Sequence, residues 1–403
     1  MPTPAPDRPL RIMSVVGARP NMMKLAPFAH ALAAHAGRLE HCIVHTGQHY
    51  DHKMSQTFFE SLGIPPPDVD LGVGSGTHAE QVGRTMIEFE EVVRQRRPDW
   101  VVVIGDVNAT AACAITAKKE HLRCAHIEAG LRSFDMDMPE EINRLVTDRL
   151  SAALFTPDAI SDANLRAEGV PPARIHCVGN IMIDTLERNR EQAARLDPAA
   201  IVRANAGDGV PSGPLPPLAD DAFAAVTLHR PSNVDDPAIL GPLVDFFVDE
   251  LTRDMPLIWP IHPRTRKQLE TFGLAAKVRG CRSILLTEPL GYHDMLRLNM
   301  GARVMFTDSG GLQEECCVLG TPCLTLRWNT ERPVTLVEQG GVSLLVGNDL
   351  GRIREAYRRV KDQPRTPRRP PLWDGHTAER IAAFFAAEHG SAAAGGTRTT
   401  AVR

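Results

Sequence analysis

Short apolar runs alternate with amphipathic stretches along most of the chain. In the first half, runs rich in Val, Ile and other apolar residues predict strands at 11–17, 40–46, 100–104 and 123–127. In the second half, similar runs predict strands near 223–228, 257–261, 283–287, 303–306 and 323–327. The segments between them show helical periodicity, and strands that alternate with helices are typical of a parallel sheet covered by helices. We therefore expect an α/β protein with two doubly wound lobes.

A polar stretch rich in Gly and Pro, 204–219, separates the two sets of strands. Helical periodicity continues through the sequence DTLERNREQAARL before this stretch begins, so the break between the lobes falls between 180 and 220. We place the N-terminal lobe at 11–180 and the C-terminal lobe at 181–374.

The two ends of the chain carry weaker patterns. The segment 375–390 predicts an amphipathic helix, and 391–403, rich in Ala, Gly and Thr, predicts a disordered tail. The segment 1–11 is rich in Pro and lacks the apolar core of a secretion signal. No window approaches the ~20 apolar residues that cross a bilayer. We therefore expect a soluble, cytoplasmic protein with no membrane partner.

Composition and charge exclude some classes of partner. The chain has 403 residues, enough for two or three domains, with 43% hydrophobic and 23% charged residues. Its net charge is −4. This weak negative balance argues against a nucleic-acid partner, because proteins that follow phosphates carry a clustered positive excess.

Aromatic residues and cysteines narrow the candidate chemistry further. Aromatic residues make up 5% of the chain, so any platform on which a base or a sugar stacks is small. The eight cysteines show no CxxC pair and no metal-finger spacing. We therefore expect small buried thiols in a reducing compartment and no metal site.

Polar side chains follow most of the predicted strands at the carboxyl end, where ligands bind to open α/β sheets. In the first lobe these residues are Gly17, Arg19, Pro20, Lys24, Thr46, Gln48, His49, Asp106 and Glu128. In the second lobe they are His229, Arg230, His262, Arg264, Glu288, Asp308, Ser309 and Arg327. Two such rims that point the same way would define one interdomain cleft.

The segment 304–324 is the most informative part of the second lobe. Its sequence predicts a strand, a turn through 309–311 (SGG), and a helix that Gly320 ends. Small residues at a helix N-terminus let backbone N–H groups approach a phosphate, which the helix dipole also favours. Glu315, one turn further, would accept hydrogen bonds from ribose hydroxyls. The alternative is a glycine-rich turn that only starts a helix.

Charged residues at helix starts allow two interpretations each. Arg19 and Lys24 would supply cations for a diphosphate or for a carboxylate network, or they are solvated charges. Glu140 and Arg144 lie four positions apart, so the arginine would hold the carboxylate on one helix face. Alternatively, Asp137 and Glu140 form a capping box and nothing more.

Two histidines and a glycine-rich segment are further candidates for function. His229 and His262, both at strand ends, are either functional or structural. The sequence GVGSG at 72–76 lacks a preceding apolar strand and the GxGxxG spacing of a dinucleotide-binding turn. We interpret it as a flexible loop.

Eight segments occur in the same order as the motifs of a known family. They are VVGARPNMMKLAPF, HTGQHYD, VIGDVNAT, HIEAGLRSFD, PEEINR, TLHRPSN, TDSGGLQEE and GTPCLTLRWNTERP. With these motifs the chain resembles the non-hydrolysing UDP-N-acetylglucosamine 2-epimerases over residues 11–350. The resemblance implies a fold of glycosyltransferase-B type, with two Rossmann-like lobes, an interdomain cleft and a C-terminal helix that returns to the first lobe.

The resemblance also implies roles for individual residues. It places the diphosphate of the nucleotide against Arg19, Ser309, Gly310 and Gly311, the ribose against Glu315, and the uracil near Tyr292. The acid/base carboxylates of the family match Asp106, Glu128 and Glu140. Its supporting polar residues match Lys24, Arg144, His229 and Arg332, and we count His229 among the catalytic candidates.

The implied reaction exchanges the configuration at C2 of the sugar. The C2 proton is not adjacent to a carbonyl, so simple deprotonation and reprotonation is not available. The resemblance implies elimination of UDP to give 2-acetamidoglucal and re-addition of UDP, with interconversion of UDP-GlcNAc and UDP-ManNAc. A carboxylate must take the proton while cations and helix-end N–H groups stabilise the departing diphosphate. No cofactor is required, and the family habit is a homodimer.

Three positions depart from the usual motifs of the family. The commoner QHR is replaced by Gln48-His49-Tyr50, GTRPE has Asn21 at its last position, and HRR has Pro231 at its last position. The region of Gln48 helps bind a second substrate molecule as an activator in bacterial relatives, and the resemblance does not extend to this activation. The altered residues also allow a related substrate, such as a modified UDP-hexosamine.

Three other functions compete with the epimerase hypothesis. A hydrolysing relative would release UDP and free N-acetylmannosamine. A UDP-sugar glycosyltransferase would need an acceptor site and often a membrane-facing amphipathic patch, which the first lobe lacks. A binding protein without catalysis would gain nothing from Asp106, Glu128 and Glu140, because uncompensated acids beside a diphosphate weaken its binding.

Overall fold

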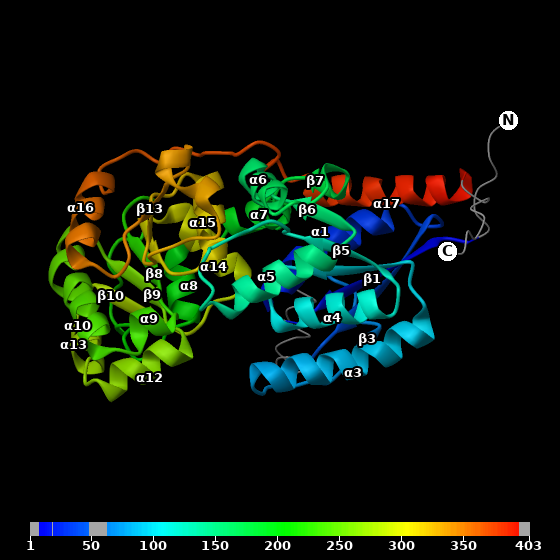
Figure 1. The fold of residues 1–403 in the computed structure, drawn as a ribbon. Coiled ribbons are helices and arrows are strands. Elements are labelled where there is room, and N and C mark those ends of the chain that lie inside the picture. Colours follow the sequence, from blue (N-terminus) through cyan, green and yellow to red (C-terminus); the bar gives the residue numbers. More distant parts are fainter. Residues whose placement is uncertain (1–7, 18, 48–62, 395–403) are drawn as a thin grey trace. The chain divides into compact units, whose positions relative to one another are not determined.

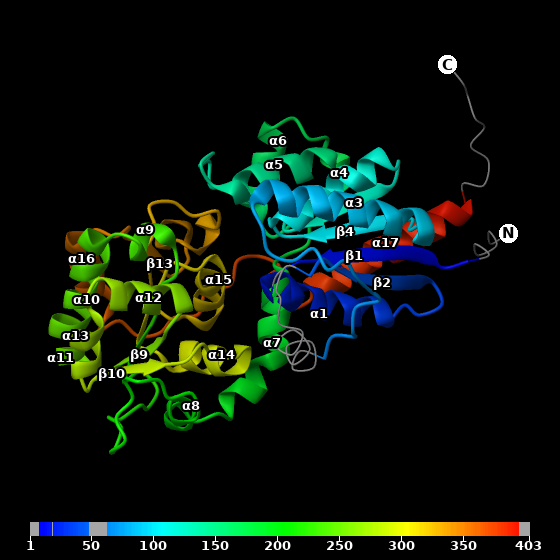
Figure 2. The same cartoon turned by 90° about the horizontal axis from the view of Figure 1, so that it is seen from below.

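Two parallel sheets flanked by helices make up the fold (Figures 1 and 2). The computed structural model describes residues 8–17, 19–47 and 63–394. Every pair of neighbouring strands in both sheets is parallel. The prediction of two doubly wound α/β lobes is therefore confirmed.

The chain forms two units, and the first is discontinuous in sequence. Unit 1 contains the chain up to Thr185 and again from Pro371, whereas unit 2 contains Leu186–Pro370. The division falls inside the helix α7 (Ile181–Ala194).

The sheet of unit 1 has the strand order β3-β2-β1-β4-β5-β6-β7. Its strands are β1 (Leu10–Val16), β2 (Leu39–His45), β3 (Val69–Asp70), β4 (Trp100–Ile104), β5 (Arg123–Ile127), β6 (Ala153–Thr156) and β7 (Ile175–Cys177). The central strand β4 is buried at every position, as expected for a strand that helices cover on both faces. The strand order reverses between β1 and β4, and such a switch point is where open α/β sheets bind ligands.

Two helical layers cover this sheet. Besides α7, the helices are α1 (Arg19–Ala33), α3 (His78–Arg96), α4 (Asn108–Lys119), α5 (Pro139–Leu150), α6 (Ala159–Ala167) and α17 (Thr377–Ala394). On one face α1 packs against α17, and on the other α4 packs between α3 and α5 (Figure 2).

The C-terminal helix α17 is anchored to unit 1 at its start and along its length. The Asp184 carboxylate accepts the N–H groups of Thr377 and Ala378 at 3.1 and 2.7 Å, which places a negative charge at the positive end of the helix. Further along, the ring of Phe385 lies 5.5 Å from the Trp100 ring and 5.9 Å from the Phe155 ring. The last segment of the chain therefore completes the core of the first unit.

The sheet of unit 2 has the order β10-β9-β8-β11-β12-β13, which repeats the Rossmann pattern. Its strands are β8 (Ala224–Thr227), β9 (Leu257–Pro260), β10 (Ile284–Thr287), β11 (Val304–Thr307), β12 (Cys323–Thr325) and β13 (Ser343–Leu345). The helices are α8 (Pro198–Ala204), α9 (Pro231–Val234), α10 (Pro237–Phe246), α11 (Thr252–Asp254), α12 (Pro263–Thr271), α13 (Ala275–Gly280), α14 (Tyr292–Gly301), α15 (Gly310–Leu319) and α16 (Leu350–Val360). Aromatic rings fill the core, with Phe306 edge-on to Phe246 and Phe247.

The structure adds strands that the sequence pattern does not predict. All nine predicted strands lie within two residues of observed ones. The strands β3, β6, β7 and β13, with two to four residues each, were missed. The segment 72–76 is a loop, as predicted.

The predicted boundary between the C-terminal helix and the tail, at residue 391, lies too early in the sequence. The helix α17 continues to Ala394, so the expectation of disorder is wrong for 391–394, where Ala residues extend the helix. The remainder of the predicted tail, 395–403, lies outside the described residues. Within the described part of the chain, no helix is both long and apolar enough to cross a bilayer.

The contacts of α17 predict a large loss of stability when its buried ring is removed. Phe385 is fully buried, so Phe385→Ala should lower the free energy of unfolding by about 3–5 kcal/mol, the usual cost of an aromatic cavity. Phe134→Ala is the control, since that side chain is 76% exposed in the same unit. Urea unfolding of both variants measures the difference, and equal effects would contradict the anchoring of α17.

Candidate active site

The turn after β4 brings four candidate polar groups of unit 1 together. Gly105 has φ +69°, in the left-handed region that favours glycine. A Cβ atom at Gly105 would lie 3.1 Å from the Asn21 amide nitrogen, 3.3 Å from Lys24 Nζ and 3.4 Å from Glu128 Oε2. Asp106 follows directly in the chain. The predicted residues Lys24, Asp106 and Glu128 therefore gather at one turn.

Lys24 and Glu128 form a buried ion pair. Lys24 Nζ donates to Glu128 Oε2, and the two residues are only 7% and 5% exposed. Glu128 has φ +73°, a strained conformation for a residue with a side chain. Backbone strain of this kind costs about 1–3 kcal/mol and is concentrated at functional sites. Lys24 is thus a partner of the carboxylate network and not a solvated charge.

Asp106 is held from the side of α5. Arg144 Nη1 lies 2.5 Å from Asp106 Oδ2, and the Asn143 amide donates to the Asp106 carbonyl oxygen at 2.9 Å. Arg144 also binds Glu141 at 2.5 Å. The side chain of Asp106 is 26% exposed, which leaves part of its carboxylate open to solvent.

The predicted pairing of Glu140 with Arg144 is wrong. Glu140 is exposed, and Arg144 binds the buried carboxylates of Glu141 and Asp106 instead. The alternative capping box is also wrong, because α5 begins at Pro139 after Met138 as its N-cap. One residue shifts the direction of a helical side chain by ~100°, so Glu141 faces inward and Glu140 does not.

Glu141 holds the loop that precedes α5. Its carboxylate accepts the N–H groups of Ser133 and Phe134, both at 3.0 Å. Burial by itself would raise the pKa of Glu141, but these donors and Arg144 outweigh it and hold the pKa below the usual range. Sequence reasoning missed Glu141. The inward spacing of Glu141, Arg144 and Asp148 on α5 is the signal that identifies it.

The remaining candidates of unit 1 are Arg19, Gln48 and His49. Arg19 begins α1. Gln48 lies outside the described residues, as does His49.

In unit 2, the predicted glycine-rich helix start is confirmed. Ser309 is the N-cap of α15, and its side chain makes no capping hydrogen bond. A Cβ atom at Gly310 would lie 2.6 Å from Arg332 Nη1, whereas at Gly311 it would have open space. The first N–H groups of a helix have no partner within the helix, so this end can bind an anion. Gly320 ends the helix with φ +78°.

Arg332 belongs to a buried cluster of charges beside Gly310. Its Nε lies 2.7 Å from Glu314 Oε1, and its Nη1 binds Glu331. Arg327 Nη2 also binds Glu331, at 2.7 Å. Burial would raise the pKa of Glu331, but Arg332 and Arg327 outweigh it and lower the pKa well below the usual range. Arg332 thus lies beside the start of α15, Arg327 is linked to it through Glu331, and the sequence points to both arginines.

Glu315 and Tyr292 are neighbours in the interior of unit 2. Glu315 is 3% exposed, and burial raises the pKa of its carboxyl to about 7. Burial also raises the pKa of Tyr292, and the nearby Glu315 adds to this rise. A carboxyl that is neutral at mildly acidic pH can donate a hydrogen bond as well as accept one.

His229 is fixed by Asp308. Its Nδ1 lies 2.6 Å from Asp308 Oδ1, and its side chain is 42% exposed. The same carboxylate accepts the backbone N–H of Arg230 at 2.9 Å and the Asn233 amide at 3.1 Å. The His229 ring lies 5.6 Å from that of His262, and both histidines line one pocket with Leu290. His229 therefore presents a positioned ring to this pocket.

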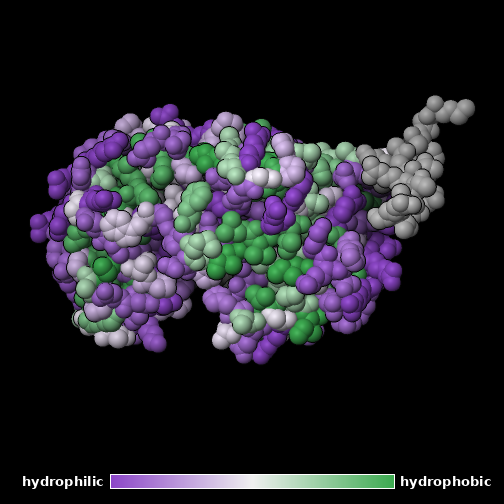
Figure 3. Space-filling view, viewed as in Figure 1, coloured by the Kyte–Doolittle hydropathy of each residue, from purple (hydrophilic) through white to green (hydrophobic). Residues whose placement is uncertain are grey.

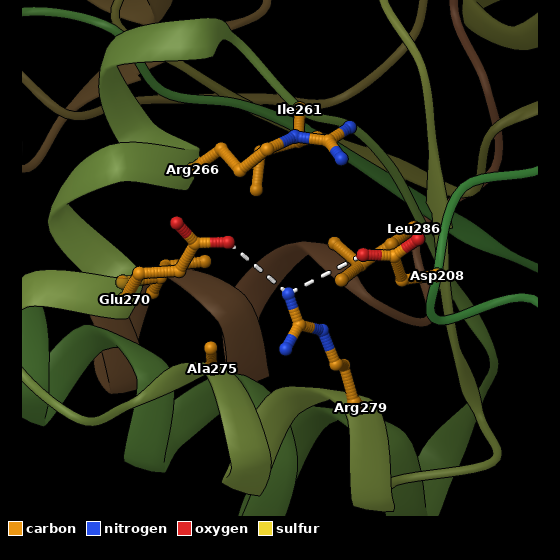
Figure 4. A pocket seen from close by; sticks show the side chains of 8 residues that line it. Asp208, Ile261, Arg266, Glu270, Ala275, Arg279 and Leu286 are labelled. Carbon is orange, nitrogen blue, oxygen red and sulfur yellow. Dashed lines mark hydrogen bonds and ion pairs between the residues drawn. The ribbon is translucent and has the colours of Figure 1, made fainter.

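A second pocket in unit 2 contains none of the predicted residues. Figure 4 shows Arg279 between Glu270 and Asp208, at 3.2 and 3.4 Å. These pairs join α12 and α13 to the loop after α8, which indicates a structural role. Within the described part of the chain, no group of three or more His, Cys, Asp or Glu side chains is arranged to hold a metal ion.

The sheet topology and the two rims define a class of two-lobed α/β proteins of glycosyltransferase-B type, and the comparisons with known proteins narrow this class. The profile of the UDP-N-acetylglucosamine 2-epimerase family matches residues 30–386. The chain belongs to this family, as the motifs of the sequence indicate.

Three relatives illustrate the similarity. The UDP-N-acetylglucosamine 2-epimerase of Methanocaldococcus jannaschii is 40% identical over 92% of this chain and 98% of its own length. The UDP-2,3-diacetamido-2,3-dideoxy-D-glucuronate 2-epimerase of Pseudomonas aeruginosa is 37% identical over 94% of this chain and 99% of its own. A crystal structure of the Methanocaldococcus jannaschii enzyme in complex with UDP-GlcNAc and UDP superposes with a TM-score of 0.81 at 39% identity, covering 93% of this chain and 99% of that chain.

The raised pKa of Glu315 predicts a pH-dependent stability. Between the ordinary carboxyl pKa and about 7, the folded state keeps a proton that the unfolded chain releases, so stability falls as pH rises through this window. Glu315→Gln removes this loss. Relative to the wild type, the variant should gain roughly 2–3 kcal/mol of unfolding free energy between pH 5 and pH 8.

Urea unfolding at the two pH values measures this gain. The control is Glu338→Gln, which changes an exposed carboxylate of the same unit. Parallel pH dependences of wild type and Glu315→Gln would show that the carboxyl is not held neutral.

Proposed function

We propose that the protein is a non-hydrolysing UDP-N-acetylglucosamine 2-epimerase. It interconverts UDP-GlcNAc and UDP-ManNAc by eliminating UDP to 2-acetamidoglucal and adding UDP back, with a proton returned to C2 on the opposite face of the sugar. Membership of the family supports this function, and the observation that carries it is the gathering of Asp106, Lys24 and Glu128 around the Gly105 turn.

Asp106 and Glu128 are proposed to exchange the C2 proton. Each carboxylate has a cation beside it that fixes its direction, Arg144 for Asp106 and Lys24 for Glu128. Elimination and re-addition need one group to remove a proton and a group to return one, so paired carboxylates suit both directions. Glu140, exposed in the first turn of α5, stays a third candidate.

The start of α15 is proposed to hold the diphosphate of UDP. Ser309, Gly310 and Gly311 offer backbone N–H groups, and Arg332 lies next to Gly310. These donors stabilise the negative charge that grows on the diphosphate as its bond to the sugar breaks. Arg19 at the start of α1 is a further proposed partner of the phosphates, Tyr292 of the uracil and Glu315 of the ribose. His229, oriented by Asp308, is a proposed supporting donor.

A modified UDP-hexosamine is a second candidate substrate. The Pseudomonas aeruginosa relative is named for a diacetamido glucuronate and is 37% identical over 94% of this chain, close to the 40% of the Methanocaldococcus jannaschii relative. The two sugars share the acetamido group at C2 and differ at C3 and C6, so the proposed C2 chemistry serves both.

Incubation in D₂O tests the proposed reaction directly. Incubation with UDP-GlcNAc alone should give an equilibrium mixture of two UDP-sugars that carry deuterium at C2. NMR of the sugar protons measures this exchange. A parallel sample with UDP-2,3-diacetamido-2,3-dideoxyglucuronate decides which sugar turns over faster. Free N-acetylmannosamine would indicate a hydrolase. Unchanged spectra with both sugars would refute epimerisation and leave a glycosyltransferase or a binding protein.

Amide variants test the assigned carboxylates in the same assay. Asp106→Asn and Glu128→Gln should slow C2 exchange by about 100-fold or more, since removal of an acid or base typically costs 10²–10⁴-fold. Glu120→Gln serves as the matched control, because Glu120 pairs with Arg94 at the end of α4 and lies outside the proposed site. Exchange at the wild-type rate in both Asp106→Asn and Glu128→Gln would reject the assignment.

We also propose that the protein is a homodimer that pairs through unit 1. Large apolar side chains are exposed there, with Ile87 at 65%, Met136 at 60% and Ile142 at 48%. Figure 3 shows apolar side chains gathered over α4 and α5. Large exposed apolar patches mark surfaces that bind other molecules, including other protein chains.

Light scattering coupled to size exclusion tests the dimer. The wild type should have the mass of two chains, and Ile142→Asp should shift it toward one, because a charge in an apolar interface is costly to bury. Trp328→Ala, at an exposed aromatic residue of unit 2, is the control. A monomeric wild type, or an Ile142→Asp variant that stays dimeric, would contradict an interface at this patch.

A further inference from the structure

A buried histidine lies directly behind the turn that carries Asp106. His126, on β5, is fully buried. Its Nε2 lies 2.8 Å from the Gly105 carbonyl oxygen, and its Nδ1 lies 2.6 Å from Asp148 Oδ1 on α5. Both ring nitrogens therefore contact oxygen atoms of the protein.

The partners determine where the protons of this ring lie. A peptide carbonyl oxygen only accepts hydrogen bonds, so Nε2 must carry a proton. The Asp148 carboxylate also accepts the Gly130 N–H at 3.1 Å and lies 2.7 Å from Arg132 Nη1. Burial would raise the pKa of Asp148, but His126 and Arg132 outweigh it and lower the pKa below the usual range. The Gly130 N–H and the Arg132 guanidinium both donate to Asp148, so its carboxylate acts as an acceptor, and we take Nδ1 to donate to it as Nε2 donates to the Gly105 carbonyl.

The surrounding charges balance a ring that is protonated on both nitrogens. Arg132, itself only 2% exposed, binds Asp148 and also Glu168, at 2.7 Å. The group thus contains two cations, His126 and Arg132, and two carboxylates. Buried charges persist in proteins when they are paired in this way.

The pair of His126 and Asp148 is attached to both turns that bear the proposed acid/base groups. His126 donates to the carbonyl of Gly105, the residue before Asp106. Asp148 accepts from the N–H of Gly130, two residues after Glu128. Gly130 has φ +79°, and a Cβ atom there would lie 2.5 Å from the Ser161 carbonyl oxygen, so this second turn has no freedom to shift.

We infer that His126 is a positioning residue whose two ring nitrogens both donate, one to Asp148 and one to the Gly105 carbonyl, and that it fixes the Gly105 and Gly130 turns so that Asp106 and Glu128 keep their relative placement. The inference rests on the proposed function for those two carboxylates. Neither His126 nor Asp148 contacts the substrate in this role. Their effect is expected in the chemical step and not in substrate affinity.

The protonation state is tested first, in the wild-type protein and without substrate. Nitrogen-15 NMR of ring-labelled histidine at pH 8 should show one residue with both nitrogens protonated, and His126→Gln assigns that signal by its loss. A ring with one unprotonated nitrogen overturns the inference, whatever the activity of the protein. This measurement is independent of turnover.

Kinetics test the positioning role. His126→Gln keeps one donor and loses the charge and one hydrogen bond, so kcat for the UDP-hexosamine should fall about 10- to 100-fold, the scale expected for a misplacement of about 1 Å. KM should stay within about threefold, since the substrate-binding groups are unchanged. His41→Gln is the matched control, because His41 lies in the same sheet and its Nε2 bonds the Ser14 hydroxyl at 2.8 Å.

The outcomes separate this inference from the proposed function. A wild type without turnover refutes the proposed function, and the ring spectrum then still decides the protonation. With an active wild type, equal kcat values for His126→Gln and His41→Gln overturn the positioning role. A rise in KM at constant kcat overturns it as well, because that pattern belongs to lost substrate binding.

Discussion

The interior of both units depends on pairing buried charges. Glu128, Glu141 and Glu314 are buried, and an unpaired buried charge is too costly to keep. In unit 1, Lys24 compensates Glu128 and Arg144 compensates Asp106. In unit 2, Arg332 binds the buried Glu314. Each pairing also fixes the direction of a side chain, so the same contacts that make burial tolerable give the candidate groups their geometry.

The two sheets repeat one strand order with different chemistry at their rims. Both follow the Rossmann pattern, with a switch between β1 and β4 in one unit and between β8 and β11 in the other. Unit 1 places carboxylates after its strands. Unit 2 places a glycine-rich helix start after β11 and an ordered histidine after β8. The two units share one scaffold, and the residues at the strand ends determine the different chemistry of each unit.

The strands and the rim residues could be predicted from the sequence, whereas the partners of those residues could not. Apolar runs located the long strands, and their carboxyl ends pointed to Asp106, Glu128 and His229. The pairing of Arg144 with Glu141 depends on which face of α5 turns inward, and a shift of one residue reverses the answer. The contact of His126 with the Gly105 carbonyl joins two neighbouring strands, β4 and β5, and their register is visible only in the folded sheet.

The return of α17 to unit 1 has a consequence for synthesis of the chain. Unit 2 is continuous from Leu186 to Pro370, so all of its parts have left the ribosome before the first unit is complete. Trp100 and Phe155 can pack against Phe385 only after Phe385 has been synthesised, more than two hundred residues after either of them. Domains usually mature in the order of translation. Here the second unit can be native while the first is still an unfinished core, and the emergence of α17 is the event that completes the N-terminal half.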